Sequence, residues 1–135
     1  MGKDLKKLRV GIIGCGRISV RHIGSAMLLP QAELAAVCDI RRERAEAAAK
    51  DSGARVYTDY KEMIEKEKLD CVHICLPHYL HVPVAEYAFS HKVNVLSEKP
   101  MSIKYEDAER AVKTAKESGV LYGVIFQSRY NDASV

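Results

Sequence analysis

Closely spaced glycines near the start of the chain could bind a phosphate group through backbone N–H groups. Residues 11–19 read Gly-Ile-Ile-Gly-Cys-Gly-Arg-Ile-Ser and continue an apolar run. Gly14 would permit a tight turn, and Gly16 would let the backbone approach a pyrophosphate because no Cβ stands in the way. Arg17 and Ile18 follow where a helix is expected to begin, and the N–H groups and dipole of a helix start favour an anion. The spacing predicts a dinucleotide-binding loop, with a glycine turn that binds no ligand as the alternative.

An acidic residue stands at the spacing that ribose recognition requires. Asp39 lies 20 residues after Ser19, a small residue at the third glycine position of the dinucleotide fingerprint. A carboxylate there accepts hydrogen bonds from the adenosine ribose and repels a 2′-phosphate, so Asp39 favours NAD over NADP. Arg41 and Arg42 follow and could clamp a 2′-phosphate, which keeps NADP as an alternative. The structural alternatives are a helix N-cap for Asp39 and a solvated helix face for the arginines.

A third group of residues could mimic metal ligands. Cys71, His73 and Cys75 alternate along an apolar run, so on a strand they would share one face. No fourth ligand is near in the sequence, and a helix should cover that face of the strand. We therefore expect buried thiols and a packed histidine rather than a metal site.

Short apolar runs alternate with longer amphipathic stretches, and this order predicts the fold. Runs with little internal alternation are typical of parallel strands covered on both faces. Alternation of strands and helices implies right-handed crossovers, so we predict an α/β fold: a doubly wound parallel sheet (Rossmann fold) of about six strands in the order 3-2-1-4-5-6. The expected strands are residues 10–13, 34–38, 55–57, 71–76, 93–96 and 120–126, and the expected helices lie within residues 17–29, 41–52, 59–64, 83–88 and 102–118.

Residues with capping or stop preferences mark the expected helix ends. Asp59 has capping-box spacing, and Ser102 is also expected to cap a helix. Pro83 suits a first helical turn. Gly53 and Gly119 are expected to end the helices before them.

Length and composition favour one globular domain. The 135 residues are 47% hydrophobic and 29% charged, so we assign residues 1–127 to a nucleotide-binding domain and residues 128–135 to the start of a linker. The net charge of +3 is spread along the chain, so we expect no nucleic-acid partner. No apolar run reaches the roughly 18 residues of a membrane helix, and no signal-peptide pattern is present. The four cysteines suit reduced thiols, and we expect a cytoplasmic protein.

Two polar segments end neighbouring strands of the expected sheet, at the edge where open α/β sheets bind ligands. Residues 75–81 read Cys-Leu-Pro-His-Tyr-Leu-His, and residues 94–100 read Asn-Val-Leu-Ser-Glu-Lys-Pro. With the glycine loop and Arg129, these segments resemble the glucose–fructose oxidoreductase/inositol dehydrogenase (Gfo/Idh/MocA) family of oxidoreductases over residues 9–130. The Glu-Lys-Pro motif of residues 98–100 is the specific part, because a glycine loop alone fits many nucleotide-binding proteins.

The resemblance implies roles for the residues of these segments. Lys99 would lie beside the nicotinamide and the reacting hydroxyl as the catalytic residue, where a cation can polarise a carbonyl or exchange a proton. Glu98 would pair with or orient Lys99, and Pro77 and His81 would line the cofactor. Pro100 would fix the turn, and the bond before it could be cis, as about 5% of X–Pro bonds are. The alternatives are exposed loop charges for the motif and a helix-start side chain for His81.

Members of this family carry a second α/β domain, built around an open sheet, that supplies substrate contacts and most of the oligomer interface. The resemblance thus implies the nucleotide-binding half of an NAD(P)-dependent oxidoreductase that acts, as a homo-oligomer, on a sugar, polyol or related small molecule. The chain alone would bind NAD(H) weakly and turn over no substrate. One alternative is a non-catalytic dinucleotide-binding module, which the short length favours. Another is a methyltransferase that binds S-adenosylmethionine, which would leave the motif of residues 98–100 unexplained.

Overall fold

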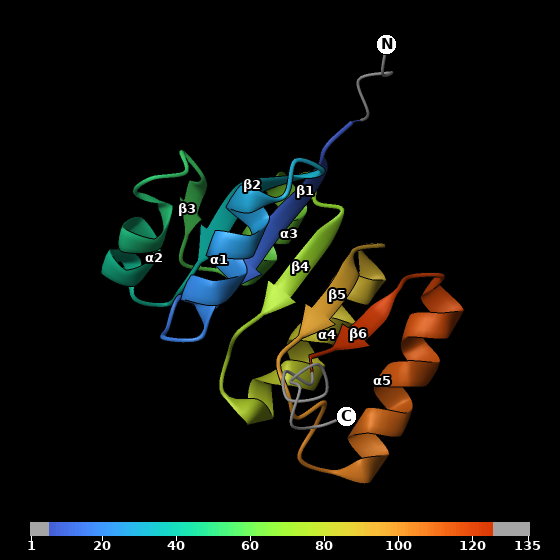
Figure 1. The fold of residues 1–135 in the computed structure, drawn as a ribbon. Helices are drawn as coiled ribbons and strands as arrows, with labels where there is room; N and C mark the ends of the chain where they lie inside the picture. Colours follow the sequence, from blue (N-terminus) through green and yellow to red (C-terminus); the bar gives the residue numbers. More distant parts are fainter. Residues whose placement is uncertain (1–5, 126–135) are drawn as a thin grey trace, which may run out of the picture.

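The computed structural model describes residues 6–125, which form a six-stranded sheet with α-helices on both faces (Figure 1). The strand order is β3-β2-β1-β4-β5-β6, and each neighbouring pair is parallel. This confirms the predicted doubly wound sheet. The elements are β1 (Leu8–Ile13), α1 (Ser19–Leu28), β2 (Ala32–Cys38), α2 (Arg42–Ala49), β3 (Arg55–Tyr57), α3 (Tyr60–Lys66), β4 (Cys71–Ile74), the 3₁₀ turn η1 (His78–Leu80), α4 (His81–Ser90), β5 (Asn94–Ser97), α5 (Tyr105–Ser118) and β6 (Tyr122–Val124).

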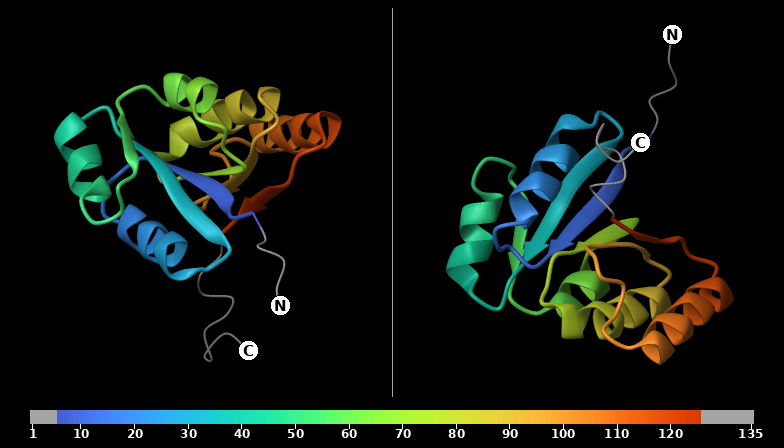
Figure 2. Two further views of the ribbon diagram at one scale, coloured as in Figure 1. Left: turned by 90° about the horizontal axis from the view of Figure 1, so that it is seen from above. Right: turned by 60° about the horizontal axis from the view of Figure 1, so that its bottom comes forward.

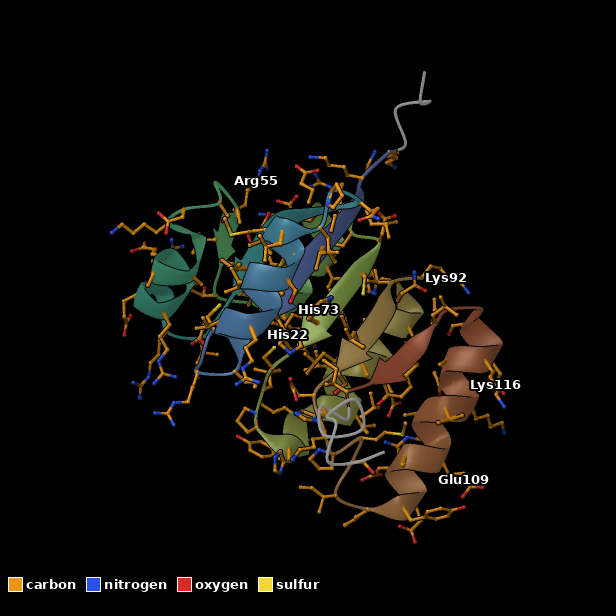
Figure 3. All side chains as sticks on the ribbon, in the orientation of Figure 1. His22, Arg55, His73, Lys92, Glu109 and Lys116 are labelled. Carbon is orange, nitrogen blue, oxygen red and sulfur yellow. The ribbon has the colours of Figure 1, made fainter. Side chains whose placement is uncertain are left out.

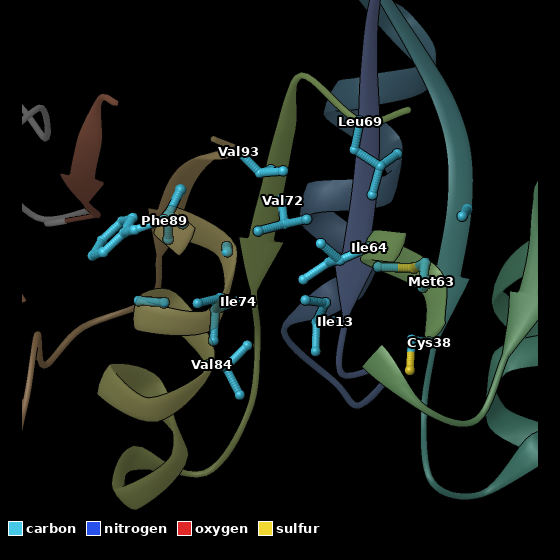
Figure 4. Packing of buried hydrophobic residues seen from close by; sticks show 14 of the residues in the cluster. Ile13, Cys38, Met63, Ile64, Leu69, Val72, Ile74, Val84, Phe89 and Val93 are labelled. Atoms are coloured by element: carbon cyan, nitrogen blue, oxygen red, sulfur yellow. The ribbon is translucent and has the colours of Figure 1, made fainter. Parts of the chain in front are cut away.

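Each face of the sheet has its own apolar cluster. The helices α1 and α2 lie on one face, and α3, α4 and α5 lie on the other (Figure 2). The α1 and α2 side buries Ile12 and Val37. The opposite side buries Met63, Ile74 and Phe89 among the residues of the larger cluster (Figure 4). Right-handed crossovers explain the two layers, because the helices leave in opposite directions on either side of the boundary between β1 and β4.

The strands β4 and β5 differ from the prediction of strands covered on both faces. In each of them buried residues alternate with partly exposed ones. Within residues 6–125, α1 and α2 contact β1, β2 and β3, so this half of the sheet has no covering helix on their side. His73 and Leu96, which are paired in register, lie on that partly exposed side.

Local signals set several helix ends. Asp59 is the N-cap of α3, and its carboxylate accepts a hydrogen bond of 2.9 Å from the backbone N–H two residues on, as predicted. Gly119 ends α5 with φ 73°, the left-handed conformation expected of a glycine stop. The prediction that Ser102 caps α5 is wrong. The loop after β5 extends to the actual N-cap, Lys104, so the Ser102 hydroxyl lies outside the helix start and donates to the Lys104 carbonyl.

Three predictions fall outside the described residues. These are the end of the domain at residue 127, the linker of residues 128–135, and the place of Arg129. The last strand is shorter than predicted, because only the three residues of β6 pair with β5. Among the helices of residues 6–125, none is long and apolar enough to cross a membrane.

A buried carboxylate, that of Glu67 after α3, contacts side chains of β1 and β3. The Glu67 side chain is 4% exposed and accepts hydrogen bonds from Arg9 Nη2 at 2.9 Å and from the Tyr57 hydroxyl at 2.8 Å. Arg55 Nε lies 3.6 Å from the same carboxylate. A groove of about 440 Å³ beside this network is lined in part by Arg9 and Arg55. Glu67 follows α3 and Arg9 lies near the start of β1, whereas the glycine loop follows its end, so we assign the network to packing of the fold.

Candidate functional site

The glycine loop passes between the ends of β2 and β4. Gly14 has φ 95°, and its N–H donates to the Cys38 carbonyl at 2.8 Å. A Cβ placed on Gly14 would lie 2.5 Å from the Cys75 carbonyl oxygen, closer than such atoms can approach. The turn therefore requires glycine at this position both for its backbone conformation and for space.

The start of α1 presents backbone donors to open space. A Cβ on Gly16 would have no atom of the described chain within 4 Å. Among residues 6–125, no acceptor lies in hydrogen-bonding geometry with the N–H groups of Gly16, Arg17 or Ile18. Ser19 is 1% exposed, and its hydroxyl donates to the Gly16 carbonyl at 2.6 Å, which closes the turn and explains why a small residue is needed there. Unpartnered N–H groups at a helix start fit a pyrophosphate.

Asp39 joins the glycine loop to the segment after β2. Its carboxylate accepts hydrogen bonds from the Cys15 N–H at 2.9 Å and from the Arg41 N–H at 2.8 Å. The N-cap of α2 is Arg41, so Asp39 is not the helix cap that was its structural alternative. A carboxylate that has accepted two hydrogen bonds still has lone pairs for ribose hydroxyls. Arg41 and Arg42 are exposed, and Arg42 lies 3.6 Å from a glutamate one turn along α2.

The Cys15 thiol beside this carboxylate is neutral at physiological pH. Burial, and secondarily the Asp39 carboxylate, raise the pKa of Cys15 to about 11. The thiol donates to the Cys38 carbonyl across 3.4 Å. A protonated thiol adds no negative charge to the loop, so it does not oppose an anionic ligand.

A mostly apolar cleft of about 300 Å³ adjoins Asp39, at the carboxyl-terminal ends of β1, β2 and β3. Ile40, which follows the carboxylate, is 89% exposed at its rim. Apolar walls edged by the Asp39 and Asp59 carboxylates suit a flat aromatic base joined to a sugar. The apolar lining of this cleft was not predicted from the sequence, although Ile40, the apolar residue directly after Asp39, could have indicated it. The lining residues are Ile13, Gly14, Cys38, Asp39, Ile40, Thr58, Asp59, Tyr60, Leu76, Leu80 and Val84.

The loop after β5 presents Lys99 at the same edge of the sheet. The Lys99 side chain is exposed, and the Lys99–Pro100 peptide bond is cis. Glu98 is 8% exposed, and its carboxylate Oε1 lies 2.7 Å from His22 Nε2. Among the described residues, no hydrogen bond or ion pair joins Glu98 to Lys99. The Glu98 side chain thus contacts α1, and its effect on Lys99 stays a prediction.

His81 joins the loops that follow β4 and β5. Its side chain is completely buried, with Nδ1 2.7 Å from the Pro100 carbonyl oxygen and Nε2 2.7 Å from that of Leu76. Both ring nitrogens are therefore engaged by the protein backbone, and the ring caps no helix N–H. Pro77 is exposed beside it and precedes η1. Cofactor contacts of Pro77 and His81 stay predictions.

A histidine pair that sequence analysis did not find lies beneath the Lys99 loop. His22 Nδ1 is 2.9 Å from His73 Nδ1, and the rings meet edge to face (Figure 3). Burial, with a smaller effect of His22, lowers the pKa of His73 to about 4. Burial also raises the pKa of Cys71 to about 11 and that of Cys75 to about 12. Within residues 6–125, no group of three or more His, Cys, Asp or Glu side chains could hold a metal ion.

The sequence matches the model of one protein family, described as "Oxidoreductase family, NAD-binding Rossmann fold" (GFO_IDH_MocA), over residues 8–126. A dTDP-3,4-didehydro-2,6-dideoxy-alpha-D-glucose 3-reductase of Streptomyces violaceoruber is 34% identical over 120 residues. This alignment covers 88% of the present chain and 35% of the reductase.

Two solved structures are similar to this chain in fold and sequence. The WlbA dehydrogenase of Bordetella pertussis, solved with NADH and UDP-GlcNAcA, has a TM-score of 0.91 and 36% identity. The match covers 96% of this chain and 40% of that one. KijD10, a 3-ketoreductase of Actinomadura kijaniata solved with NADP and TDP-benzene, has a TM-score of 0.84 and 30% identity. The match covers 88% of this chain and 37% of the KijD10 chain.

The chain therefore spans between 35% and 40% of the lengths of these three proteins. The family match begins at the first residue of β1 and extends past β6, so it includes the whole sheet and the loops that follow β1 to β5 at its carboxyl-terminal edge. Because the match spans the sheet and these loops together, the chain belongs to the Gfo/Idh/MocA family of oxidoreductases and contains its NAD-binding Rossmann domain.

Proposed function

We propose that this chain is the nucleotide-binding domain of an NAD(P)-dependent oxidoreductase that transfers hydride between a nicotinamide and a CH–OH or carbonyl group of a sugar, polyol or related molecule. One observation carries the proposal: the glycine loop, Asp39 and Lys99 follow β1, β2 and β5 along one edge of the parallel sheet (Figure 1). This is the edge at which open α/β sheets bind ligands. The relatives support a sugar-like substrate, since one is a glucose-derivative reductase and another was solved with UDP-GlcNAcA.

The residues along this edge suit successive parts of a dinucleotide. The cleft next to Asp39 would take the adenine, and the carboxylate would accept hydrogen bonds from the ribose. The unpartnered N–H groups of Gly16, Arg17 and Ile18 would donate to the pyrophosphate. A bound nicotinamide supplies the donor or acceptor of the hydride.

Lys99 is the residue that we assign to the chemical step. Its exposed ammonium group lies on the loop after β5, toward the nicotinamide end of a cofactor placed in this way. There Nζ would stabilise negative charge on the reacting oxygen and exchange its proton as that oxygen changes between hydroxyl and carbonyl. Pro77, on the neighbouring loop, would line the same end.

We propose that NAD is preferred over NADP. The two backbone hydrogen bonds to the Asp39 carboxylate hold it between the glycine loop and the start of α2, where a 2′-phosphate would meet a like charge. Arg41 and Arg42 are the side chains through which NADP would bind instead. Both cofactors occur in the family, since the relatives were solved with NADH and with NADP.

A substrate domain after residue 127, a homo-oligomeric state and a cytoplasmic location belong to the same proposal. They follow from the family resemblance and from the greater length of the relatives. The present chain alone would bind NAD(H) weakly and turn over no substrate. Family membership argues against the S-adenosylmethionine methyltransferase that was a third possibility.

Calorimetric titration of the chain with NAD⁺ and with NADP⁺ tests the cofactor assignment. We expect binding of NAD⁺, and binding of NADP⁺ that is weaker by at least about tenfold, which corresponds to 1.4 kcal/mol. Absence of heat with both would refute the cofactor site. Equal or tighter binding of NADP⁺ would assign the specificity to the arginines.

In the full-length protein, Lys99→Ala should lower kcat by about 100-fold or more, since a positioned acid–base group contributes at least that much. Lys104→Ala, which alters an exposed lysine five residues on, is the matched control. A fall in kcat of less than about threefold would remove Lys99 from the chemistry. Cofactor binding without oxidoreductase activity toward sugars and polyols would support the non-catalytic module.

A further inference from the structure

Both neighbours of Lys99 are held by buried histidines. His22 of α1 contacts the Glu98 carboxylate, and His81 at the start of α4 contacts the Pro100 carbonyl. The two histidines are 6% and 0% exposed, whereas Lys99 is exposed. The helices that carry them cover opposite faces of the sheet (Figure 2). Lys99 therefore extends from a loop that is anchored immediately before and immediately after it.

Both ring nitrogens of His22, the contact residue of α1, lie within hydrogen-bonding distance of a side chain. Carboxylate oxygens accept hydrogen bonds, so Nε2 of His22 is the donor toward Oε1 of Glu98 across 2.7 Å. Nδ1 of His22 lies 2.9 Å from Nδ1 of His73. His73 is neutral at pH 7, because burial lowers its pKa to about 4, and it can share one hydrogen with His22. The His22 ring cannot rotate without losing one of these contacts.

The contact from α4 spans two loops. The ring of His81 lies between the Pro100 and Leu76 carbonyl oxygens, at 2.7 Å from each. A carbonyl oxygen accepts and does not donate, so the ring nitrogen that carries a hydrogen donates it to the carbonyl oxygen that it faces. Leu76 and Pro100 belong to the segments after β4 and β5 that the proposed function places around the nicotinamide. His81 therefore sets the separation of these two segments.

The helix α1 extends this anchoring to the other end of the cofactor site. It begins at Ser19, directly after the glycine loop, and His22 follows within its first turn. A helix is rigid over so short a distance, so the contact of His22 with Glu98 fixes the Lys99 loop relative to the N–H groups of the glycine loop.

We propose that His22 and His81 are positioning residues, which clamp the loop of residues 98–100 and thereby hold Lys99 Nζ at the nicotinamide end of the bound cofactor. The inference rests on the proposed function, since Lys99 must reach that end. The two histidines act through Glu98 and Pro100, and neither needs to contact the cofactor. This differs from the direct cofactor contact that the family resemblance implied for His81.

Acetylation of Lys99 tests the clamp on the 135-residue chain, without turnover. Saturating NAD⁺ should slow the labelling of Lys99 by acetic anhydride, followed by mass spectrometry, about tenfold. In His22→Leu and in His81→Leu this protection should fall to less than about twofold, although the affinity for NAD⁺ changes by less than about threefold. His22→Gln keeps an N–H near the position of Nε2 and should retain the protection. His91→Gln, which alters an exposed histidine just after α4, is the matched control.

Each outcome decides between two explanations. A merely structural role would lower the melting temperature of the leucine variants and leave Lys99 protected at equal NAD⁺ occupancy, and this result would overturn the clamp alone. No protection in the unaltered chain would overturn the proposed placement of Lys99 and the clamp with it. If His81→Leu does not fold, His81→Asn, whose side chain is too short to span both carbonyls, replaces it with the same expected loss.

Discussion

Replacing Gly14 and Gly16 by alanine, one at a time, separates what the fold requires of the glycine loop from what a bound cofactor requires. At Gly14 the requirement comes from the protein, since φ is 95° and a Cβ would lie 2.5 Å from a backbone carbonyl oxygen. At Gly16 a Cβ would meet no atom of the described chain within 4 Å, and φ is not positive. The two substitutions add the same methyl group two residues apart, so each is the control for the other.

The expected magnitudes differ strongly. A Cβ in the left-handed region costs roughly 1–2 kcal/mol, and overpacking against backbone adds roughly 1–3 kcal/mol. Gly14→Ala should therefore lower the free energy of unfolding by about 2–5 kcal/mol, a large part of the roughly 5–15 kcal/mol of an ordinary domain. Gly16→Ala should change it by less than about 0.5 kcal/mol. It should weaken NAD⁺ binding by at least about tenfold, because the methyl group occupies the space proposed for the pyrophosphate.

Urea denaturation without cofactor measures the first effect, and calorimetric titration with NAD⁺ measures the second. If Gly14→Ala lowers the free energy of unfolding by less than about 1 kcal/mol, the turn can relax to accommodate a Cβ. The fold would then not require glycine at this position. If Gly16→Ala binds NAD⁺ as tightly as the unaltered chain does, the pyrophosphate does not lie over that residue. Either result would refute the corresponding half of the reasoning.

Three further predictions concern charge and stability. Glu67→Ala should lower the free energy of unfolding by about 1.5–3 kcal/mol in urea, since it removes the hydrogen bonds that Arg9 and Tyr57 donate to the buried carboxylate, whereas the exposed control Glu62→Ala should cost less than about 1 kcal/mol. The pKa of His73 is lowered from 6.5 to about 4, so the unfolded chain binds more protons between these values. The free energy of unfolding should thus fall by up to about 3 kcal/mol as the pH drops from 6.5 to 4, and His73→Gln should flatten this dependence; an unchanged slope would assign the titration to other groups. Asp39→Ser should weaken NAD⁺ binding about tenfold by calorimetry and reduce the discrimination against NADP⁺, and an unaltered ratio would dissociate Asp39 from ribose recognition.

The parts of the site that could be predicted from the sequence depend on short spacing or on topology. The turn at Gly14 and the carboxylate of Asp39 meet because β1 and β2 are adjacent parallel strands, and the fingerprint encodes that adjacency. The parallel sheet with helices on both faces followed from alternation of strands and helices together with right-handed crossovers. Both signals act within one βαβ unit, so one sequence is enough to read them.

The contacts of Glu98 and His81 could not be predicted from the sequence in this way. Glu98 and His22 are 76 residues apart and come from different βαβ units. An adjacent opposite charge, Lys99, was the more obvious partner for Glu98, but successive residues at a strand end point to opposite sides. Likewise, the position of His81 at a helix start suggested a cap, whereas its ring contacts carbonyls of two loops. Glu98 and His81 thus each contact a residue of another loop or helix, 76 and 19 residues away, that the local sequence did not indicate.

The strand order explains why His22 is that partner. β1 pairs with both β2 and β4, and the helices on either side of this boundary cover opposite faces of the sheet. The α1 side of β4 and β5 is therefore left without a covering helix among the described residues, and a hollow of about 220 Å³ lies there, lined in part by His22, His73 and Glu98. A carboxylate at the edge of this hollow needs a donor, and α1 is the helix of that face that borders it. The topology that separates the glycine loop from the Lys99 loop thus also supplies the hydrogen bond that joins them, and His22→Leu tests this by breaking the bond while leaving the sheet unaltered.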